Sequence, residues 1–533
     1  MIGPLAPKLT LARAVGAISR RRGGGGTSAP GKALLTLAPD AIATLGERLA
    51  RGSVVISATN GKTTTAAMAA AILSGDGTRL VHNRAGANMA GGIASTLLDA
   101  ARPRGEIAGE LGLFEVDELW LGRLVEQLRP RAIVLGNLFR DQLDRYGELD
   151  TIAERWAQTT SSGAGAAARL VLNADDPVLA DIGRTRTRPS EPARTGIGAA
   201  GAADGRPAEP GDSRPAKPGH VGRDVIYFGV QDDSLALSGL AHAADAKHCR
   251  NCGAPYVFDA IYLGHLGRYH CAACGQARPE PSVSAREVRL EGVRAARFTL
   301  CTPQGEAEVR LALPGLYNVY NALAAAALAC ALEVPLARIV AGLQGTQAAF
   351  GRAETLTLEE PVRRELRILL VKNPAGANEV LRTLALEPGE HDVLGVLNDE
   401  IADGRDVSWI WDADFELLAG RVRRATCSGT RAAELAMRLK YAGVPSERIR
   451  VEPELASALD AAAADRVSST VFAAPARAGA ETSAPAATAA SSRAPSPADA
   501  PPPLYALPTY TAMLALRDLL AARRGGAHRS ALP

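Results

Sequence analysis

The 533-residue chain has little net charge, no long apolar run and few histidines. Its 60 Lys and Arg residues nearly balance its 57 Asp and Glu residues, so bulk electrostatics gives no argument for a nucleic-acid-binding protein. No apolar run reaches the roughly 18 residues that a membrane-spanning helix needs. The basic N-terminal stretch lacks the apolar core and cleavage site of a secretory signal. We therefore expect a cytoplasmic protein without a transmembrane segment.

Composition separates folded stretches from spacers. A chain of this length would hold about three domains of roughly 150 residues each. Residues 192–222 and 475–503 are dense in Gly, Pro and Ala and have no periodic apolar face, which predicts disordered insertions. The predicted divisions are a flexible N-terminal arm at 1–33, a central domain at 34–355 and a C-terminal α/β domain at 360–525.

Apolar runs alternate with helix-length segments along most of the chain. This alternation predicts an α/β fold in which helices cover a mostly parallel, doubly wound sheet, followed by a second, Rossmann-like α/β domain. Residues 297–313 differ, because they predict a β-hairpin that turns at Pro303–Gly305. The predicted strands are 54–57, 109–116, 132–135 and 170–173 in the first series, and 368–371, 393–397, 424–427, 449–451 and 471–474 in the second.

The residues after the first apolar run have the layout of a phosphate-binding loop. The sequence Thr-Asn-Gly-Lys-Thr-Thr-Thr at 59–65 opens an alanine-rich helix. The N-terminus of such a helix offers unpaired N–H groups and a positive dipole end to phosphate oxygens. Lys62 would reach the terminal phosphates of ATP, and the Thr63 hydroxyl would ligate magnesium. Because Ile56 stands where the first glycine of the strict pattern belongs, a plain helix start is the alternative. The predicted ATP-binding residues of this loop are Thr59, Asn60, Gly61, Lys62, Thr63 and Thr64.

Acidic and amide side chains follow the next three strands. Glu115 closes the strand at 109–116, at the sheet edge where folds of this type bind ligands, and its carboxylate would hold a second magnesium. A polar stretch at 137–147 follows the next strand, and Asp175 and Asp176 follow the one after it. Each of these groups also fits a solvated strand end, a helix cap or a turn.

Four of the seven cysteines form two Cys-x-x-Cys pairs separated by eighteen residues, a spacing typical of a structural zinc site. A glycine follows each pair and would let the turn aim backbone N–H groups at the thiolates. Redox use and accident are the alternatives, and His265 and His270 are minor candidates for ligands. Four thiolates leave no open position for a substrate, so this zinc would stabilise the fold. The predicted zinc ribbon spans about 245–280, with the ligands Cys249, Cys252, Cys271 and Cys274.

Taken in order along the chain, these motifs resemble the Mur ligase family of ATP-dependent amide-bond-forming enzymes. The resembling pieces also include Leu-Pro-Gly-Leu-Tyr-Asn-Val-Tyr-Asn-Ala-Leu at 313–323 and Gly-Arg-Ala-Glu at 351–354. The resemblance implies that Lys62 and Thr63 bind ATP phosphate and magnesium and that Glu115 holds magnesium. It also implies that Asn318, Asn321 and Arg352 frame the nucleotide, with Asp175 nearby.

Departures from the ordinary pattern narrow the resemblance. Ala58 and Gln142 stand where ordinary Mur ligases have glycine and histidine, and only about fifty residues precede the phosphate loop, which leaves no room for a UDP-binding domain. Together with the cysteine pairs and the segments 403–412 and 508–514, these departures resemble the MurT family. That resemblance covers nearly the whole chain, apart from the N-terminal arm and the two insertions. That resemblance implies amidation of the α-carboxyl of D-glutamate in the stem peptide of lipid II, through an acyl phosphate, at the cytoplasmic membrane surface.

The ammonia for such a reaction needs a source. Glutamine hydrolysis requires an activated nucleophile, and Cys301, Cys330 and Cys427 have no glutaminase-like context among only eight histidines. We expect a separate glutaminase, and the resemblance implies a GatD-type subunit whose cysteine–histidine pair receives an aspartate from this chain. Asp406 is the predicted residue and Asp403 the alternative; both also fit simple turn caps.

Two other functions fit parts of the sequence. A Mur-type ligase that joins amino acids, such as a folylpolyglutamate synthase-like enzyme, would share the ATP site but should lack the cysteine pairs and the segment 403–412. A non-catalytic zinc-ribbon binding protein would need neither Lys62 nor Glu115, and the presence of both residues speaks against it.

Overall fold

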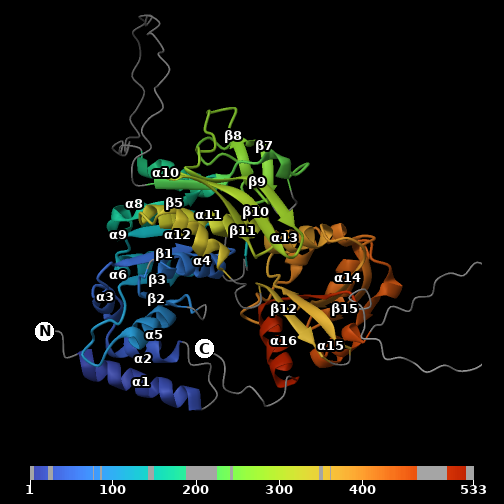
Figure 1. Cartoon of the computed structure of the whole chain (residues 1–533), viewed down its shortest axis with the longest axis horizontal. Helices are drawn as coiled ribbons and strands as arrows, with labels where there is room; N and C mark the ends of the chain where they lie inside the picture. The colour runs from blue at the N-terminus through green and yellow to red at the C-terminus, as the bar shows by residue number, and fades with distance from the viewer. Residues whose placement is uncertain are drawn as a thin grey trace, which may run out of the picture.

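The computed structural model describes residues 5–21, 28–75, 77–83, 87–141, 149–187, 225–240, 244–346, 352–359, 362–464 and 501–523. The predicted insertion at 192–222, nearly all of the one at 475–503 and the predicted strand at 471–474 lie outside these residues. Within them, two large sheets lie side by side, the first built from residues 53–311 and the second from residues 352–508 (Figure 1).

The first sheet has nine strands in the order β11-β10-β9-β6-β5-β4-β1-β3-β2. The seven strands from β9 to β2 run parallel, whereas β10 and β11 extend the β9 edge as antiparallel neighbours. The hairpin predicted at 297–313 is therefore confirmed. The strands are β1 (Ser53–Ser57), β2 (Leu80–His82), β3 (Leu111–Glu115), β4 (Ala132–Leu135), β5 (Arg169–Asn173), β6 (Val225–Val230), β9 (Val283–Glu291), β10 (Ala295–Thr302) and β11 (Gly305–Leu311).

Helices cover both faces of this sheet because its central strands are apolar on both sides. Along β1, Val54 and Ile56 enter one core while Val55 enters the other, as the two-residue period of a strand requires. On the first face lie α4 (Lys62–Gly75), α11 (Leu316–Ala331) and α12 (Leu336–Gln344). On the second face lie α1 (Leu5–Arg21), α2 (Ala29–Leu37), α3 (Ala41–Gly46), α5 (Ala90–Ala100), α6 (Leu121–Leu128), α8 (Leu149–Ser161), α9 (Gly163–Ala167) and α10 (Pro177–Thr187).

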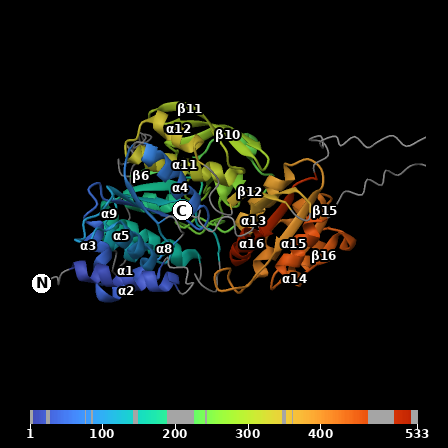
Figure 2. The same cartoon turned by 60° about the horizontal axis from the view of Figure 1, so that its bottom comes forward.

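The second sheet has six strands in the order β12-β13-β17-β14-β15-β16, parallel except for β12. Its strands are β12 (Arg352–Leu358), β13 (Arg364–Leu369), β14 (His391–Val396), β15 (Val422–Ser428), β16 (Ile449–Val451) and β17 (Leu504–Pro508). Helices α13 (Pro374–Ala385) and α14 (Ala432–Tyr441) cover one face, and α15 (Leu455–Ala463) and α16 (Tyr510–Arg523) cover the other. Figure 2 shows this second unit packed beside the first.

Two features of the second sheet differ from the sequence-based prediction. Strand β12 pairs with β13, so residues 352–355 belong to the second sheet and not to the first. Strand β17 was not predicted, yet it lies between β13 and β14. Short 3₁₀ turns complete the described secondary structure: η1 (Asp233–Leu235), η2 (Ser408–Trp411), η3 (Phe415–Leu418) and η4 (Ser446–Arg448).

The predicted flexible arm at 1–33 is wrong for its described part. Residues 5–21 form helix α1, whose Leu9 and Ala12 are fully buried in the core of the first unit. The side chain of Arg13 donates a hydrogen bond of 2.8 Å to the carbonyl oxygen of Leu98. The arm was predicted from the glycine run at 23–26, whereas these contacts join residues far apart in the sequence.

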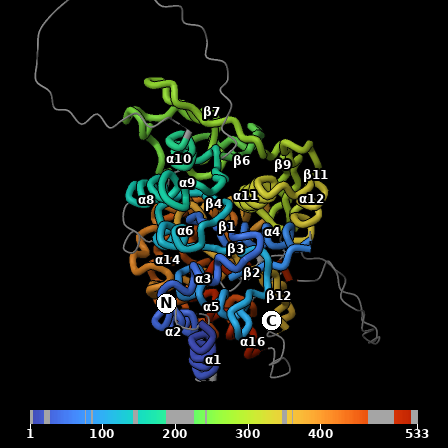
Figure 3. The backbone as a smooth tube through the Cα atoms, turned by 90° about the vertical axis from the view of Figure 1, so that its left-hand side faces the viewer, coloured from blue at the N-terminus to red at the C-terminus, as the bar shows by residue number. Residues whose placement is uncertain are grey.

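A separate antiparallel hairpin, β7 (Val257–Leu263) and β8 (Leu266–His270), lies at the end of the molecule opposite α1 (Figures 1 and 3). Ala260, Tyr262 and Leu266 bury it against the core on the α11 face of the large sheet. Among the described helices, none is long and apolar enough to cross a membrane.

Candidate active site

A cleft of about 320 Å³ lies between the two sheets. The first unit contributes the turn after β1, the ends of β3 and β4, and the first turns of α11. The second unit contributes the end of β13, the N-terminus of α13, Ala402 and Tyr510. The cleft is thus built at the carboxyl ends of parallel strands, where open α/β sheets bind ligands.

The turn at 59–61 is held in place by Asn137, which follows β4. The Asn137 side chain accepts a hydrogen bond from the Asn60 backbone N–H (2.8 Å) and donates one to the Asn60 carbonyl oxygen (2.9 Å). Gly61 has a φ of 84°, and a Cβ atom there would lie 1.9 Å from Oδ1 of Asn321. Only glycine fits both the backbone conformation and the close approach of α11.

Lys62 is buried at the start of α4 and forms an ion pair that the sequence analysis missed. Its Nζ lies 3.0 Å from both carboxylate oxygens of Glu118 and also donates to the carbonyl oxygen of Ala58. Burial alone lowers the pKa of this amine, but the charges of Glu118, Glu115 and Asp117 outweigh it, so the net pKa is raised. Lys62 therefore carries its positive charge at neutral pH.

Glu115 and Thr63 line the same cleft as Lys62. Glu115 is almost fully buried, and its backbone is fixed by the side chain of Asn83, which bonds both its N–H (2.9 Å) and its carbonyl oxygen (2.8 Å). The structure thus brings together the four groups that a phosphate–magnesium site needs, which are a helix N-terminus, a lysine amine, a hydroxyl and a carboxylate.

The two predicted asparagines of α11 occupy different positions. Asn321 lines the cleft and accepts a hydrogen bond from the Thr65 hydroxyl (3.3 Å). Asn318 is not among the lining residues; its Oδ1 accepts from Asn321 Nδ2 (3.1 Å), and its own amide donates to Pro314 (2.7 Å). Asn318 therefore orients Asn321.

Asp175 is fully buried behind the cleft. Its carboxylate accepts hydrogen bonds from Arg278 Nε (2.5 Å), the Tyr320 hydroxyl (2.6 Å) and the Val230 N–H (2.9 Å). Since Tyr320 lines the cleft, Asp175 supports the wall from behind. Arg352 begins β12, but its side chain, like Gln142, lies outside the described part of the chain.

The second unit contacts the phosphate loop directly. The amides of Asn60 and Asn373 exchange two hydrogen bonds, of 3.2 and 3.0 Å. Lys372 Nζ lies 2.5 Å from Asp141 Oδ2 and donates to the Thr59 carbonyl oxygen (3.2 Å). Asn373 also caps α13 by accepting from the Gly376 N–H (2.9 Å). Sequence analysis missed Lys372 and Asn373, although polar residues between a predicted strand and a Pro-initiated helix were the available signal.

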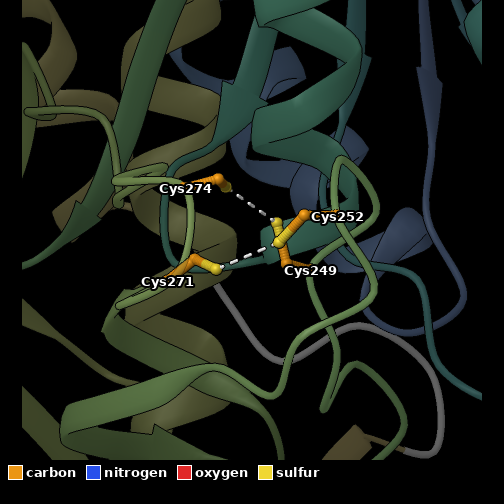
Figure 4. Close-up of side chains that lie close together, drawn as sticks. All are labelled: Cys249, Cys252, Cys271 and Cys274. Atoms are coloured by element: carbon orange, nitrogen blue, oxygen red, sulfur yellow. Dashed lines mark hydrogen bonds between the residues drawn. The ribbon is translucent and has the colours of Figure 1, made fainter.

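The four predicted cysteines converge (Figure 4). Their sulfurs lie within 4.8 Å of one another, with 3.6 Å between Cys249 and Cys274 and 3.4 Å between Cys252 and Cys271. Tetrahedral zinc with Zn–S bonds of about 2.3 Å separates its sulfurs by about 3.8 Å, so the cluster could hold zinc. His265 and His270 are not among the clustered residues.

Glycines shape both cysteine turns. Gly253 and Gly275 have φ angles of 78° and 72°, as the sequence predicts. Two hydrogen bonds, first from the Asn251 side chain and second from the Gln276 backbone N–H, lower the pKa of the Cys274 thiol to about 6. The Cys252 thiol differs: a backbone hydrogen bond from Ala254 lowers its pKa, but hydrogen bonds with the other three cysteines outweigh this and raise it to about 12.

Asp403 and Asp406 lie on the loop between β14 and η2, in different environments. Asp403 is buried and accepts hydrogen bonds from the backbone N–H (2.8 Å) and the hydroxyl of Thr511. Asp406 is exposed and accepts from the Ser408 N–H (2.8 Å). The hydroxyl and N–H of Ser408 lower the pKa of Asp406, whereas burial raises that of Asp403. Asp406 is therefore an accessible, ionised carboxylate.

A larger cavity of about 710 Å³ lies beside β6, β8 and β9. Four arginines and four acidic residues line this cavity, so it has no excess charge of one sign. Because none of the predicted site residues lines it, it is not the candidate active site. The charged residues that line it are Arg268, Arg278, Arg286, Arg289, Asp232, Asp233, Glu280 and Glu287.

Comparison with known proteins decides the family. The model of the Mur ligase middle domain matches residues 56–205, and that of the MurT ligase C-terminal domain matches residues 370–475. The MurT subunit of lipid II isoglutaminyl synthase (glutamine-hydrolyzing) from Staphylococcus aureus strain N315 is 31% identical over 436 residues, which cover 81% of this chain and 87% of that protein. The chain belongs to the MurT family. The MurT subunit from Streptococcus pneumoniae strain R6 is 30% identical over 94% of each chain.

Solved structures agree with the fold of the MurT family. The UDP-N-acetylmuramoylalanyl-D-glutamyl-2,6-diaminopimelate–D-alanyl-D-alanyl ligase of Acinetobacter baumannii has a TM-score of 0.56 at 16% identity, over 92% of this chain and 79% of that one. Mycobacterium tuberculosis folylpolyglutamate synthase complexed with ADP has a TM-score of 0.54 at 15% identity, over 91% and 94%. At these sequence identities the similarity to solved structures shows the fold alone. The MurT relatives, which are named as subunits of a synthase, show that this chain is a carbon–nitrogen ligase.

The geometry of the phosphate loop predicts that a methyl group added at position 61 weakens ATP binding. Gly61→Ala should weaken binding of a non-hydrolysable ATP analogue by about 5- to 150-fold, because a strained φ costs about 1–3 kcal/mol and the new Cβ displaces Asn321. Gly75→Ala is the matched control, since nothing lies within 4 Å of its Cβ at the other end of α4. Isothermal titration calorimetry on both variants measures this, and an unchanged affinity of Gly61→Ala would contradict the described loop.

Proposed function

We propose that the chain is the synthetase subunit that amidates the α-carboxyl of D-glutamate in the stem peptide of lipid II, giving D-isoglutamine. The observation that carries the proposal is the cleft, in which a buried lysine, two helix N-termini and a carboxylate face one another in a member of the MurT family. Because lipid II is lipid-linked, the reaction takes place at the cytoplasmic surface of the membrane.

The residues of the cleft fit ATP and magnesium. The N–H groups at the start of α4 and the charge of Lys62 would bind the terminal phosphates, and Thr63 and Glu115 would hold magnesium. Magnesium neutralises phosphate charge when it is bound. Asn321 would contact the nucleotide, with Asn318 behind it, and Arg352 is proposed as a further nucleotide residue. Lys372 adds a second positive charge from the opposite wall.

The proposed chemistry has two steps. A carboxylate oxygen of D-glutamate attacks the γ-phosphorus of ATP, which forms an acyl phosphate and releases ADP. Ammonia then attacks the acyl carbon, and the amide forms as inorganic phosphate leaves and a proton is lost. The protein orients the reactants, neutralises charge and excludes water from the acyl phosphate.

Ammonia is proposed to come from a GatD-type glutaminase that forms a heterodimer with this chain. The exposed, ionised Asp406 would complete the partner's cysteine–histidine pair by orienting the imidazole. Asp403 suits this role less well, because Thr511 already occupies its carboxylate.

Two variants separate the amidation from the ammonia supply. In the complex with its glutaminase, Asp406→Asn should lose glutamine-dependent amidation of lipid II by about 10⁴-fold, by analogy with triad aspartates, while ammonium chloride restores the product. Lys62→Ala should lose both reactions by at least about 100-fold, because it removes a charge-assisted phosphate contact.

The control is Asp412→Asn, which should retain both reactions; Asp412 follows η2, is about half exposed and lies 3.8 Å from Arg140 Nη1. Mass spectrometry of the amidated lipid II measures each rate. Loss of both reactions in Asp406→Asn would place that residue in the synthetase site, and full activity of Lys62→Ala would refute the proposed ATP site.

We also propose that the four-cysteine cluster is a structural zinc ribbon. The sulfur separations and the positive-φ glycines suit a closed Cys₄ site, and disulfides are unexpected in a cytoplasmic protein. The ribbon would fasten the β7–β8 hairpin to the loops before and after it.

The purified protein should carry about one zinc ion per chain. Cys271→Ser should release it and lower the thermal midpoint, because metal binding contributes directly to folding of such a loop. Cys301→Ser, which changes a cysteine of β10 outside the cluster, should leave the zinc content unchanged. Atomic emission analysis decides the question: absence of zinc from protein never exposed to a chelator would refute the ribbon.

A further inference from the structure

Helix α1 exposes a row of apolar side chains at the outer end of the molecule. Leu11, Val15 and Ile18 have exposed fractions of 54%, 37% and 52%. At about 100° per residue these three positions fall within an arc of about 60° on one face of the helix. The opposite face, with Leu9 and Ala12, packs into the core of the first unit. The exposed row is therefore a second apolar face that the described part of the chain leaves uncovered.

The charge of α1 is of one sign. Its sequence contains Lys8, Arg13, Arg20 and Arg21 and no acidic residue, although the whole chain is almost neutral. Because Arg13 donates to the Leu98 carbonyl oxygen, it is not counted among the charges available to a surface. Lys8 lies about 60° around the helix from Leu11, beside the apolar row. Arg48 adds a further positive charge near the first turn of α1. Both Arg48 and Leu5 lie next to Gly105: a Cβ atom placed on that glycine would be 2.1 Å from Arg48 Nη1 and 3.6 Å from the Leu5 side chain.

The position of α1 suits contact with a flat surface. It forms the end of the molecule opposite the β7–β8 hairpin, as Figures 1 and 3 show from two directions. Its 17 residues extend about 25 Å at 1.5 Å per residue. Helix α1 therefore lies at an end of the molecule, where a flat surface can reach it.

We propose that this face of α1 docks on an anionic phospholipid bilayer. An apolar row on a helix whose charged residues are all basic is the pattern of a helix that lies in the interface plane, with apolar side chains among the acyl chains and cations near the lipid phosphates. Each basic residue near such a surface strengthens binding by about fivefold. The proposal rests on the proposed function for its purpose, since docking brings the cleft to a substrate that is held in the membrane.

Vesicle binding of the full chain tests the docking directly. The wild type should sediment with vesicles of phosphatidylcholine and phosphatidylglycerol, and Leu11→Ser/Val15→Ser/Ile18→Ser should reduce the partition coefficient at least about tenfold. The matched control is Leu386→Ser/Met437→Ser/Val451→Ser, which removes three similarly exposed apolar side chains from the second unit and should bind like the wild type. A Leu11→Trp variant should show a blue-shifted emission, relative to wild type, only when anionic vesicles are present.

Several outcomes would overturn the proposal. Equal vesicle binding of the wild type and the α1 triple variant would do so, as would a wild type that binds no vesicles. Loss of self-association by the triple variant in light scattering, with vesicle binding unchanged, would show instead that the row joins two copies of the chain.

A comparison of two substrates tests membrane docking independently of the proposed amidation. With a water-soluble, short-chain analogue of lipid II, the α1 triple variant should amidate at the wild-type rate, whereas with long-chain lipid II in anionic vesicles its KM should rise about tenfold. A wild type that amidates neither substrate would refute the proposed function, and the vesicle-binding result would still decide the docking.

Discussion

The paired amides of Asn60 and Asn373 are the contact on which the candidate site depends. They join the phosphate loop of the first unit to the N-terminus of α13 in the second, across 313 residues of sequence. Lys372 strengthens the same junction through Asp141 and the Thr59 carbonyl. Asn373 also caps α13, and its partner Asn60 lies in the phosphate loop, so the junction ties the start of α13 to that loop.

A second constraint is the concentration of charge beneath the cleft. Lys62 is buried among Glu115, Asp117 and Glu118, and a lone buried ammonium group would be costly, so its ion pair with Glu118 keeps it charged and in place. The negative oxygens of a bound phosphate would give Lys62 a second anionic partner. Glu115 is the carboxylate proposed to hold magnesium beside it. Preorganisation of this kind lets charges act during phosphoryl transfer without further reorganisation.

Local sequence predicts some parts of this protein and not others, for physical reasons. The phosphate loop, the cysteine pairs and the β10–β11 hairpin were predictable because each is specified by neighbouring residues: a strand followed by a glycine turn, paired ligands followed by glycine, and alternating apolar residues around a turn. Glu118, Lys372 and Asn373 were missed because their partners are distant in sequence and only the tertiary fold brings them together. Helix α1 was mistaken for a flexible arm because its stability comes from burial of Leu9 and Ala12, which composition does not reveal. Strand β17 was missed because five residues beside a proline-rich stretch give too short a pattern.

The proposed function requires that a carboxylate is activated in the cleft as an acyl phosphate. The most direct measurement is isotope transfer, with lipid II labelled with ¹⁸O in the α-carboxyl of its D-glutamate, ATP and ammonium chloride, and mass analysis of the products. If a carboxylate oxygen attacks the γ-phosphorus and ammonia later displaces phosphate, one labelled oxygen must appear in each inorganic phosphate released. Label in AMP, or unlabelled phosphate accompanying amide formation, would contradict the account.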